Sequence, residues 1–149
     1  MRVVIDTNIA FSAILHTNSL FARIILQPKS RLNLYSTDLL LIEIEEHKEK
    51  LKRLGNYSDI ELNKSIYIIS SRIRFIDANL IPSSVLINSE KLLADIDIDD
   101  TEFVALTNHI RGKLWIGDKV LQNGLIKKGW NKFVSTDELY RLIGNKHKS

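Results

Sequence analysis

The chain has 149 residues, of which 44% are hydrophobic and 26% charged, and its formal net charge is +3. These values indicate one folded domain with a substantial core. The absence of cysteine excludes a disulfide framework, thiolate metal ligands and a cysteine nucleophile. No apolar run approaches the roughly 18 residues of a membrane span, and Asp6 interrupts any signal-peptide core, so we expect no membrane association and a cytoplasmic location.

Strands and helices are predicted to alternate along the chain. In chain order, we expect a strand at 2–5, a helical stretch at 8–27 broken near 16–18, a strand at 31–36, one long helix from Thr37 to Leu54, a helix from Ser58 to about Arg72, a strand at 74–76, a helix opened by Asp99 or Asp100, a strand at 113–116, a helix at 119–128, a strand at 132–134 and a final helix from Ser135. Residues 77–93 carry no clear pattern. This alternation predicts the α/β class, as a single domain with a central, mostly parallel sheet flanked by helices on both faces.

Three of the predicted helices start with recognisable capping residues. Thr37 and Asp38 can cap the long helix, which is expected to stop at Gly55. Ser58 with Glu61, and Ser135 with Glu138, have the spacing of capping boxes. We take residues 1–144 as the domain and residues 145–149 as a basic tail.

Charge is distributed unevenly along the chain. Residues 119–149 contain seven Lys or Arg against two acids, whereas the preceding 118 residues carry a net charge of −2. Four aspartates also fall within the six residues of DIDIDD at 95–100. An acidic cluster followed by a basic third is typical of a protein that holds cations and approaches a polyanion, although basic helices and tails are as often simply solvated.

The DIDIDD segment allows several local interpretations. A helix-loop-helix calcium site is excluded because Asp100 and Leu106 stand where that loop needs Gly and Glu. Residues 97–101 fit the DxDxT pattern of haloacid dehalogenase phosphatases, but the acid expected next, Asp118, comes too soon. A solvated acidic loop that caps a helix remains open.

The predicted topology brings several acids to the same edge of the sheet. Asp6 directly follows the first strand, and Asp118 follows the strand at 113–116 after one glycine. Asp100 starts the helix that leads into that second strand. Because sites in open parallel sheets form outside the carboxyl ends of the strands, these carboxylates should meet there. Clustered carboxylates need a neutralising cation, and oxygen ligands without cysteine favour Mg²⁺ or Mn²⁺.

Five segments in this order resemble the PIN domain family, and the resemblance spans essentially the whole chain. These segments are VVIDTNI, STDLLLIEI, DIDIDDTEFVAL, LWIGDKVLQNGLIKKGW and STDEL. The resemblance implies a metal-dependent ribonuclease similar to the VapC group of toxins, with RNA as substrate, an antitoxin protein as a possible partner and a homodimer as the expected assembly. The long helices between Thr37 and Arg72 are a candidate dimer face, but their apolar sides can equally belong to the core.

The resemblance also implies roles for individual residues. The four acids of the catalytic set correspond here to Asp6, Glu43, Asp100 and Asp118. Metal ligands are expected among Asp6, Asp97, Asp100 and Asp118, whereas Asp95 and Asp99 are expected to cap helices or act at longer range. Thr7, Asn8 and Ser12 resemble the polar set beside the first acid, where they can hold its carboxylate or cap the helix.

Basic and aromatic residues complete the expected site. Arg111, Lys119, Lys127 and Lys128 are candidates for phosphate contacts, which position RNA without reading its sequence. Trp115 and Trp130 can stack on bases, but core positions are favoured for both. The four histidines have no assigned role, because a metal-held water needs no histidine base.

One residue departs from the family pattern. Many PIN domains have Thr or Ser two residues before the fourth acid, and this chain has Ile116 there. Isoleucine cannot donate a hydrogen bond to a carboxylate or a phosphate. A catalytically weak PIN fold that binds RNA or a partner therefore stays open besides an active nuclease. A hydrolase of another phosphate ester is a third function, which only the DxDxT match of residues 97–101 favours.

Overall fold

The computed structural model describes residues 1–28 and 32–145, and within them the strands form one parallel sheet. The strands are β1 (Arg2–Ile5), β2 (Asn33–Thr37), β3 (Arg74–Ile76), β4 (Lys113–Trp115) and β5 (Phe133–Val134). Their order is β3-β2-β1-β4-β5, and all four pairings are parallel. The expected α/β class with a mostly parallel sheet is confirmed.

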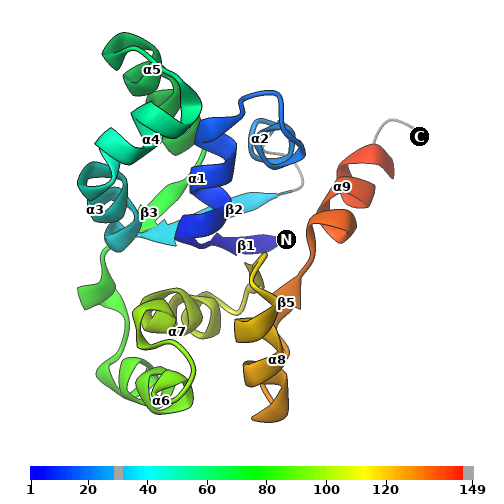
Figure 1. Ribbon diagram of the computed structural model, residues 1–149. Coiled ribbons are helices and arrows are strands. Elements are labelled where there is room, and N and C mark those ends of the chain that lie inside the picture. Colours follow the sequence, from blue (N-terminus) through cyan, green and yellow to red (C-terminus); the bar gives the residue numbers. More distant parts are fainter. Residues whose placement is uncertain (29–31, 146–149) are drawn as a thin grey trace.

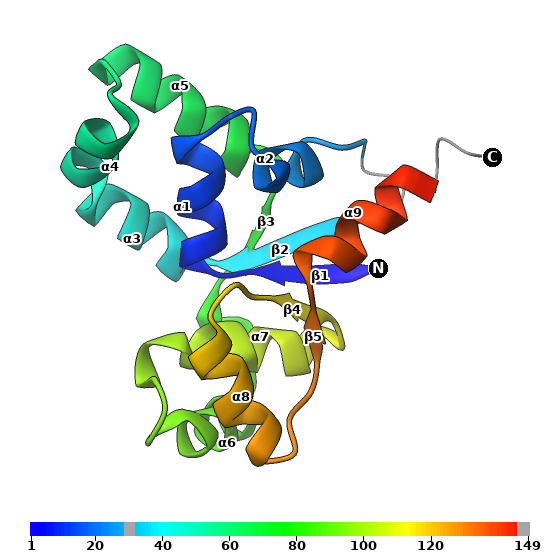
Figure 2. The ribbon, with the colours of Figure 1, turned by 45° about the vertical axis from the view of Figure 1, so that its right-hand side comes forward.

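Helices cover both faces of this sheet (Figures 1 and 2). One side carries α1 (Thr7–Leu15), α2 (Leu20–Ile25), α3 (Asp38–Glu46), α4 (Lys48–Gly55) and α5 (Asp59–Ser70). The other side carries α6 (Ser83–Leu93), α7 (Thr101–Ile110) and α8 (Lys119–Lys127), and α9 (Thr136–Asn145) returns to contact α2. Short 3₁₀ turns, η1 (Ala78–Leu80) and η2 (Ile98–Asp100), precede α6 and α7.

The strand order creates a switch point between β1 and β4. The connection after β1 leads to α1 on one face, whereas the connection after β4 leads to α8 on the other face. Neighbouring strands whose connections diverge in this way leave a crevice at their carboxyl ends, where ligands of open α/β sheets bind. Ile5 is paired with Trp115 at this point, so the residues that follow the two strands share one edge.

The core lies where apolar strand residues meet the helices on each face. Val3, Val4 and Ile5 of β1 are completely buried, as the β-branched run predicts. Trp115 is also completely buried; its ring stacks on Phe21 and its indole Nε1 donates to Thr136 Oγ1 at 2.9 Å. Trp130 is only 8% exposed, so the core positions favoured for both tryptophans are confirmed.

The prediction of one long helix from Thr37 to Leu54 is wrong, because the chain forms two helices there, α3 and α4, with a break at His47. The backbone of His47 leaves helical geometry, at φ −107° and ψ 15°, and its ring nitrogen Nδ1 donates to the Glu43 carbonyl oxygen at 2.9 Å. A side-chain donor thus competes for a carbonyl of the helix. Thr37 does occupy the N-cap position, but its buried hydroxyl makes no capping hydrogen bond.

The other predicted elements agree with the structure in some places and differ in others. Residues 77–93, which carried no clear pattern, contain η1 and the eleven-residue helix α6. The capping boxes at Ser58 and Ser135 are both present. Of the expected strand at 31–36 and the expected tail at 145–149, residue 31 and residues 146–149 lie outside the described residues. Within the described ranges, no helix is long and apolar enough to cross a membrane.

Candidate functional site

Asp6 is the buried centre of the site. It follows β1 directly and begins α1, where its carboxylate accepts a hydrogen bond from the Ile9 backbone N–H at 3.0 Å. Only 3% of the residue is exposed. Burial raises the pKa of this carboxyl to about 6; the Ile9 bond lowers it, and the charges of Asp118 and Glu43 raise it further.

Asp100 reaches the same place from the opposite face. It occupies the N-cap position of α7, yet its side chain makes no capping bond and is therefore free to face the other acids. Burial raises the pKa of this carboxyl well above its ordinary value, and the charges of Asp97, Asp6 and Asp118 add to the effect. Asp97 itself closes the preceding turn by accepting from the Asp99 N–H at 3.1 Å.

Glu43 and Asp118 complete the set from α3 and α8. Burial raises the pKa of the Glu43 carboxyl, and the Thr7 hydroxyl and the His47 charge oppose that rise. Asp118 caps α8 by accepting from the backbone N–H groups of Val120 and Leu121 at 2.9 and 3.2 Å. The structure therefore brings together the four acids that the sequence singled out, two from each side of the sheet.

An open cavity of about 280 Å³ lies beside these acids. Its lining comes from both sides of the sheet and comprises Thr7, Asn8, Phe11, Glu43, His47, Lys50, Asp97, Asp99 and Asp100. Thr7 and Asn8 were expected here, but Ser12 is not among the lining residues. The buried Thr7 hydroxyl has no hydrogen bond of ordinary geometry, although it lies close enough to the Glu43 carboxylate to lower its pKa.

Phe11, His47 and Lys50 also line the cavity, although no motif in the sequence predicted them there. Glu43 and His47 are four residues apart, His47 and Lys50 three, and Asn8 and Phe11 three, and these are spacings at which side chains are neighbours on a helix. The spacing was therefore visible in the sequence. What it did not show is that the two faces meet across one cavity, because α1 and α4 come from separate crossovers.

The acidic segment DIDIDD contacts α8 at two residues, Lys128 and Gly124. Lys128 Nζ donates to the Leu92 carbonyl oxygen at 2.8 Å and forms an ion pair with Asp95. A side chain at Gly124 would meet the side chain of Ile96 at 3.0 Å, so the absence of a Cβ lets this segment pack closely on the helix. Asp95 is thereby explained as an anchor of the segment rather than a member of the acid set.

The four basic residues expected to contact phosphate lie in different parts of the molecule. Lys119 is exposed and directly follows Asp118, so it lies next to the acids. Lys127 is exposed at the far end of α8, and Lys128 is engaged with the acidic segment. Arg111 ends α7 and donates no bond to the site; it lies a ten-residue helix, roughly 15 Å, away from Asp100.

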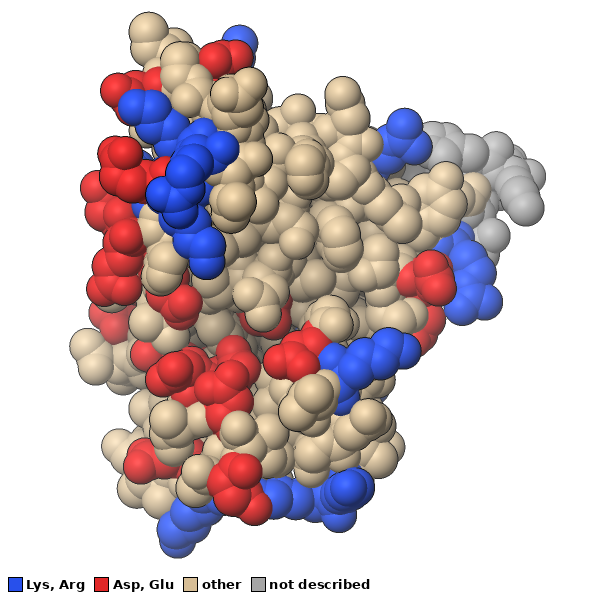
Figure 3. Space-filling model, in the orientation of Figure 1, with Lys and Arg blue, Asp and Glu red and all other residues tan. Residues whose placement is uncertain are grey.

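The chemistry of the donors fits a hard divalent cation. All four acids offer carboxylate oxygens, and acidic side chains gather across the middle of the face shown in Figure 3, with basic side chains over α4 and α5 above them. Each carboxylate makes it harder to ionise its neighbours, a cost that a cation at this place removes. Among residues 1–28 and 32–145, no three His, Cys, Asp or Glu side chains are arranged so that they could hold a metal ion together.

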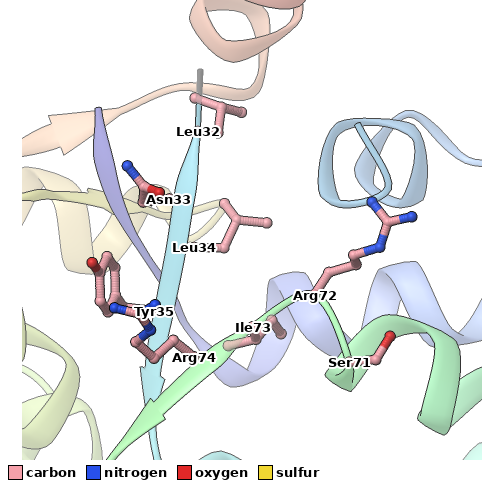
Figure 4. Close-up of a pocket in the computed structure, with 8 residues that line it drawn as sticks. All are labelled: Leu32, Asn33, Leu34, Tyr35, Ser71, Arg72, Ile73 and Arg74. Atoms are coloured by element: carbon pink, nitrogen blue, oxygen red, sulfur yellow. The ribbon is translucent and has the colours of Figure 1, made fainter. Parts of the chain in front are cut away.

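A second cavity, of about 220 Å³, lies between β2 and the start of β3. Figure 4 shows Arg72 pointing toward α2, where its guanidinium donates to the carbonyl oxygens of Leu26 and Gln27 at 2.9 and 3.1 Å. Arg74 lies over the ring of Tyr35 at 5.7 Å. The lining holds no carboxylate, and its arginines are used within the fold, so this cavity is not part of the acidic site.

The structure also removes the phosphatase interpretation of residues 97–101. That pattern places its first aspartate at the end of a buried strand, whereas Asp97 is half-buried and precedes a 3₁₀ turn after α6. The geometry instead defines a parallel α/β domain with an acidic site at its topological switch point.

Comparison with known proteins identifies the family. The PIN domain profile matches residues 4–137, almost the whole chain, so this protein belongs to the PIN domain family. Among solved structures, it is similar to a chain of VapBC2 from Rickettsia felis bound to a DNA fragment from their promoter, with 14% identity and a TM-score of 0.66. The match covers 91% of this chain and 97% of that chain. No curated protein matches significantly. The expected fold family is confirmed.

Proposed function

We propose that this protein is a divalent-metal-dependent endoribonuclease. The observation that carries the proposal is the convergence of Asp6, Glu43, Asp100 and Asp118, from both faces of the sheet, on one crevice beside an open cavity. Membership of the PIN domain family supports it, because proteins of this family are generally nucleases. The reaction is hydrolysis of a phosphodiester bond in RNA.

The four acids have distinct parts in this proposal. Asp6, Asp100 and Asp118, with support from Asp97, hold Mg²⁺ or Mn²⁺, and Glu43 directs the attacking water toward the phosphate. When bound, the cation supplies Lewis-acid stabilisation of negative charge on the reacting phosphate and makes water acidic enough to attack. Thr7 stands beside Glu43, where its hydroxyl can orient that carboxylate. Lys119, which is exposed and follows Asp118 in the chain, would contact a phosphate of the bound strand.

We further propose that the protein acts as the toxin of a toxin–antitoxin pair in the cytoplasm. The similar solved structure is a VapBC2 assembly, which supports an antitoxin protein as partner. A homodimer remains the assembly that the family resemblance implies. The net positive charge of residues 119–149 supports an approach to RNA. Residues 1–144 would constitute the nuclease domain.

A cleavage assay with a labelled single-stranded RNA tests the nuclease. The purified protein is incubated with Mn²⁺, with Mg²⁺ or with a chelator, beside Asp6→Asn and Asp100→Asn. Metal-dependent cleavage by the wild type that is lost in both variants supports the proposal. No cleavage by a folded wild-type protein that still binds Mn²⁺ would refute it.

Ile116 favours a second candidate, a catalytically weak PIN fold that binds RNA or a partner. Because residue 116 is isoleucine, no hydroxyl stands two residues before Asp118. The Ile116 side chain is 6% exposed and belongs to the core. RNA binding without cleavage, measured by the mobility shift of the same labelled RNA, would support this second function.

A further inference from the structure

Two aromatic rings form one side of the cavity beside the acids. Phe11 of α1 and His47, at the junction of α3 and α4, have ring centroids 5.6 Å apart and planes tilted by 59°. Both side chains are half-buried and both line the cavity. Lys50, one turn further along α4, is exposed at the same cavity. We call these three residues the stacking wall.

The orientation of His47 is fixed by the backbone. Its Nδ1 donates to the Glu43 carbonyl oxygen at 2.9 Å, and because a carbonyl oxygen only accepts, Nδ1 carries a proton. The ring is therefore held one helical turn from a residue of the acid set, with its other edge free of that bond. An aromatic wall is thus held at a defined position relative to Glu43.

The cavity lining carries charges of both signs. Asp97, Asp99, Asp100 and Glu43 are its acidic residues, whereas His47 and Lys50 are its basic residues. A polyanion is repelled by the acidic residues except where a cation neutralises them. The basic lining residues lie at the start of α4 and on it, so we expect the strand to pass along the side formed by α1 and α4.

We propose that the stacking wall binds an unpaired nucleotide next to the scissile phosphate, with its base against Phe11 and His47 and its phosphate on Lys50. This inference rests on the proposed nuclease function and adds to it a binding position for the nucleotide beside the cut. Aromatic side chains stack on any exposed base, and lysine contacts phosphate without reading sequence. A base held in an A-form duplex is stacked and paired, so it cannot lie against this wall.

Single-turnover cleavage with Mn²⁺ tests the inference, using the full-length protein at increasing concentration. Phe11→Leu, which keeps an apolar side chain, and Lys50→Gln are compared with matched controls away from the cavity, Phe133→Leu and Lys64→Gln. We expect Phe11→Leu to raise the half-saturating protein concentration about tenfold, with a maximal rate within about twofold of the wild type. Thermal unfolding identifies any variant that fails to fold.

An abasic scan separates base stacking from mere packing of α1 on α4. Once the cut is mapped, an abasic nucleotide is placed in turn at each position flanking it. At one position the wild type should bind about tenfold more weakly, and Phe11→Leu should lose nothing further there. Equal sensitivity of the wild type and Phe11→Leu at every position would overturn the wall while leaving the nuclease intact. Absence of any cleavage by the wild type would overturn both.

Discussion

The charge of Asp118 raises the pKa of Asp6, although the two residues begin helices on opposite faces of the sheet. They meet because β1 and β4 are neighbours with diverging connections. The protein therefore concentrates like charge at its topological switch point, and the Asp118 charge adds to the rise that burial causes in the pKa of Asp6.

The unfolding free energy of the metal-free protein should fall as pH rises from about 4 to about 6. The native pKa of Asp6, about 6, lies above its ordinary value of 3.8, so in this window the native state holds more protons than the unfolded chain. Two pKa units correspond to about 3 kcal/mol. Asp6→Asn keeps an acceptor for the Ile9 N–H and removes the ionisation, so at pH 8 with a chelator we expect it to be about 2–3 kcal/mol more stable than the wild type. Urea unfolding at pH 4.5 and pH 8 measures this, and an equal pH response in both proteins would contradict it.

Adding Mn²⁺ should stabilise the wild type, because the ion removes the repulsion that the acids suffer. At one hundred times the dissociation constant, binding adds about 2.7 kcal/mol, which is a rise of roughly 5–10 °C in melting temperature for a chain of this size. Asp100→Asn should lose most of this shift. Asp137→Asn, an exposed acid on α9, is the matched control and should retain it. If Mn²⁺ raises the melting temperature of Asp100→Asn as much as that of the wild type, Asp100 is not a ligand of the metal.

Replacement of Lys128 should weaken metal binding rather than RNA binding. Its ion pair with Asp95 and its bond to the Leu92 carbonyl hold the segment that carries Asp97 and Asp100. We expect Lys128→Met to raise the Mn²⁺ dissociation constant about threefold, since partly exposed ion pairs are weak, and Lys127→Met to leave it unchanged. If Lys128 contacts phosphate instead, its replacement would lower the salt dependence of RNA binding and spare the metal affinity.

Ile116→Thr should make the protein less stable and more active. The residue is 6% exposed, so the change removes buried apolar atoms and buries a hydroxyl, at a cost of about 1–3 kcal/mol. The new hydroxyl can donate to a carboxylate or a phosphate at the carboxyl edge of β4, and we expect several-fold faster cleavage at saturating Mn²⁺. Unchanged cleavage would mean that the missing hydroxyl has no part in the reaction.

Local signals in the sequence predicted much of this fold. The capping box of Ser58 and Glu61, and the buried run of β1, depend on neighbours in the chain and appear as expected. The break at His47 does not, because it coincides with contacts that its ring makes with Phe11 and with the Glu43 carbonyl. Such contacts exist only after the helices pack.

The candidate site divides in the same way. Residues at strand ends, such as Asp6 and Asp118, were predictable because parallel strands end at a common edge. The surroundings were not, since Lys128 and Arg111 have the same charge and comparable positions at helix ends, yet one is fastened to the acidic segment and the other lies at the far end of α7. Their placement depends on packing between faces of the sheet.

The register of β1 on β4 governs which length changes this chain can tolerate. Ile5 is opposite Trp115, and the acids follow the two strands after one and three residues. Deleting one residue within β4 would shift Asp118 by about 3.3 Å along the sheet and turn the following side chains to the wrong face. A deletion of the same size in the turn between α4 and α5 would leave every acid in place. Insertions and deletions should therefore be tolerated in connections such as the turn between α4 and α5, while the lengths of β1 and β4 are kept.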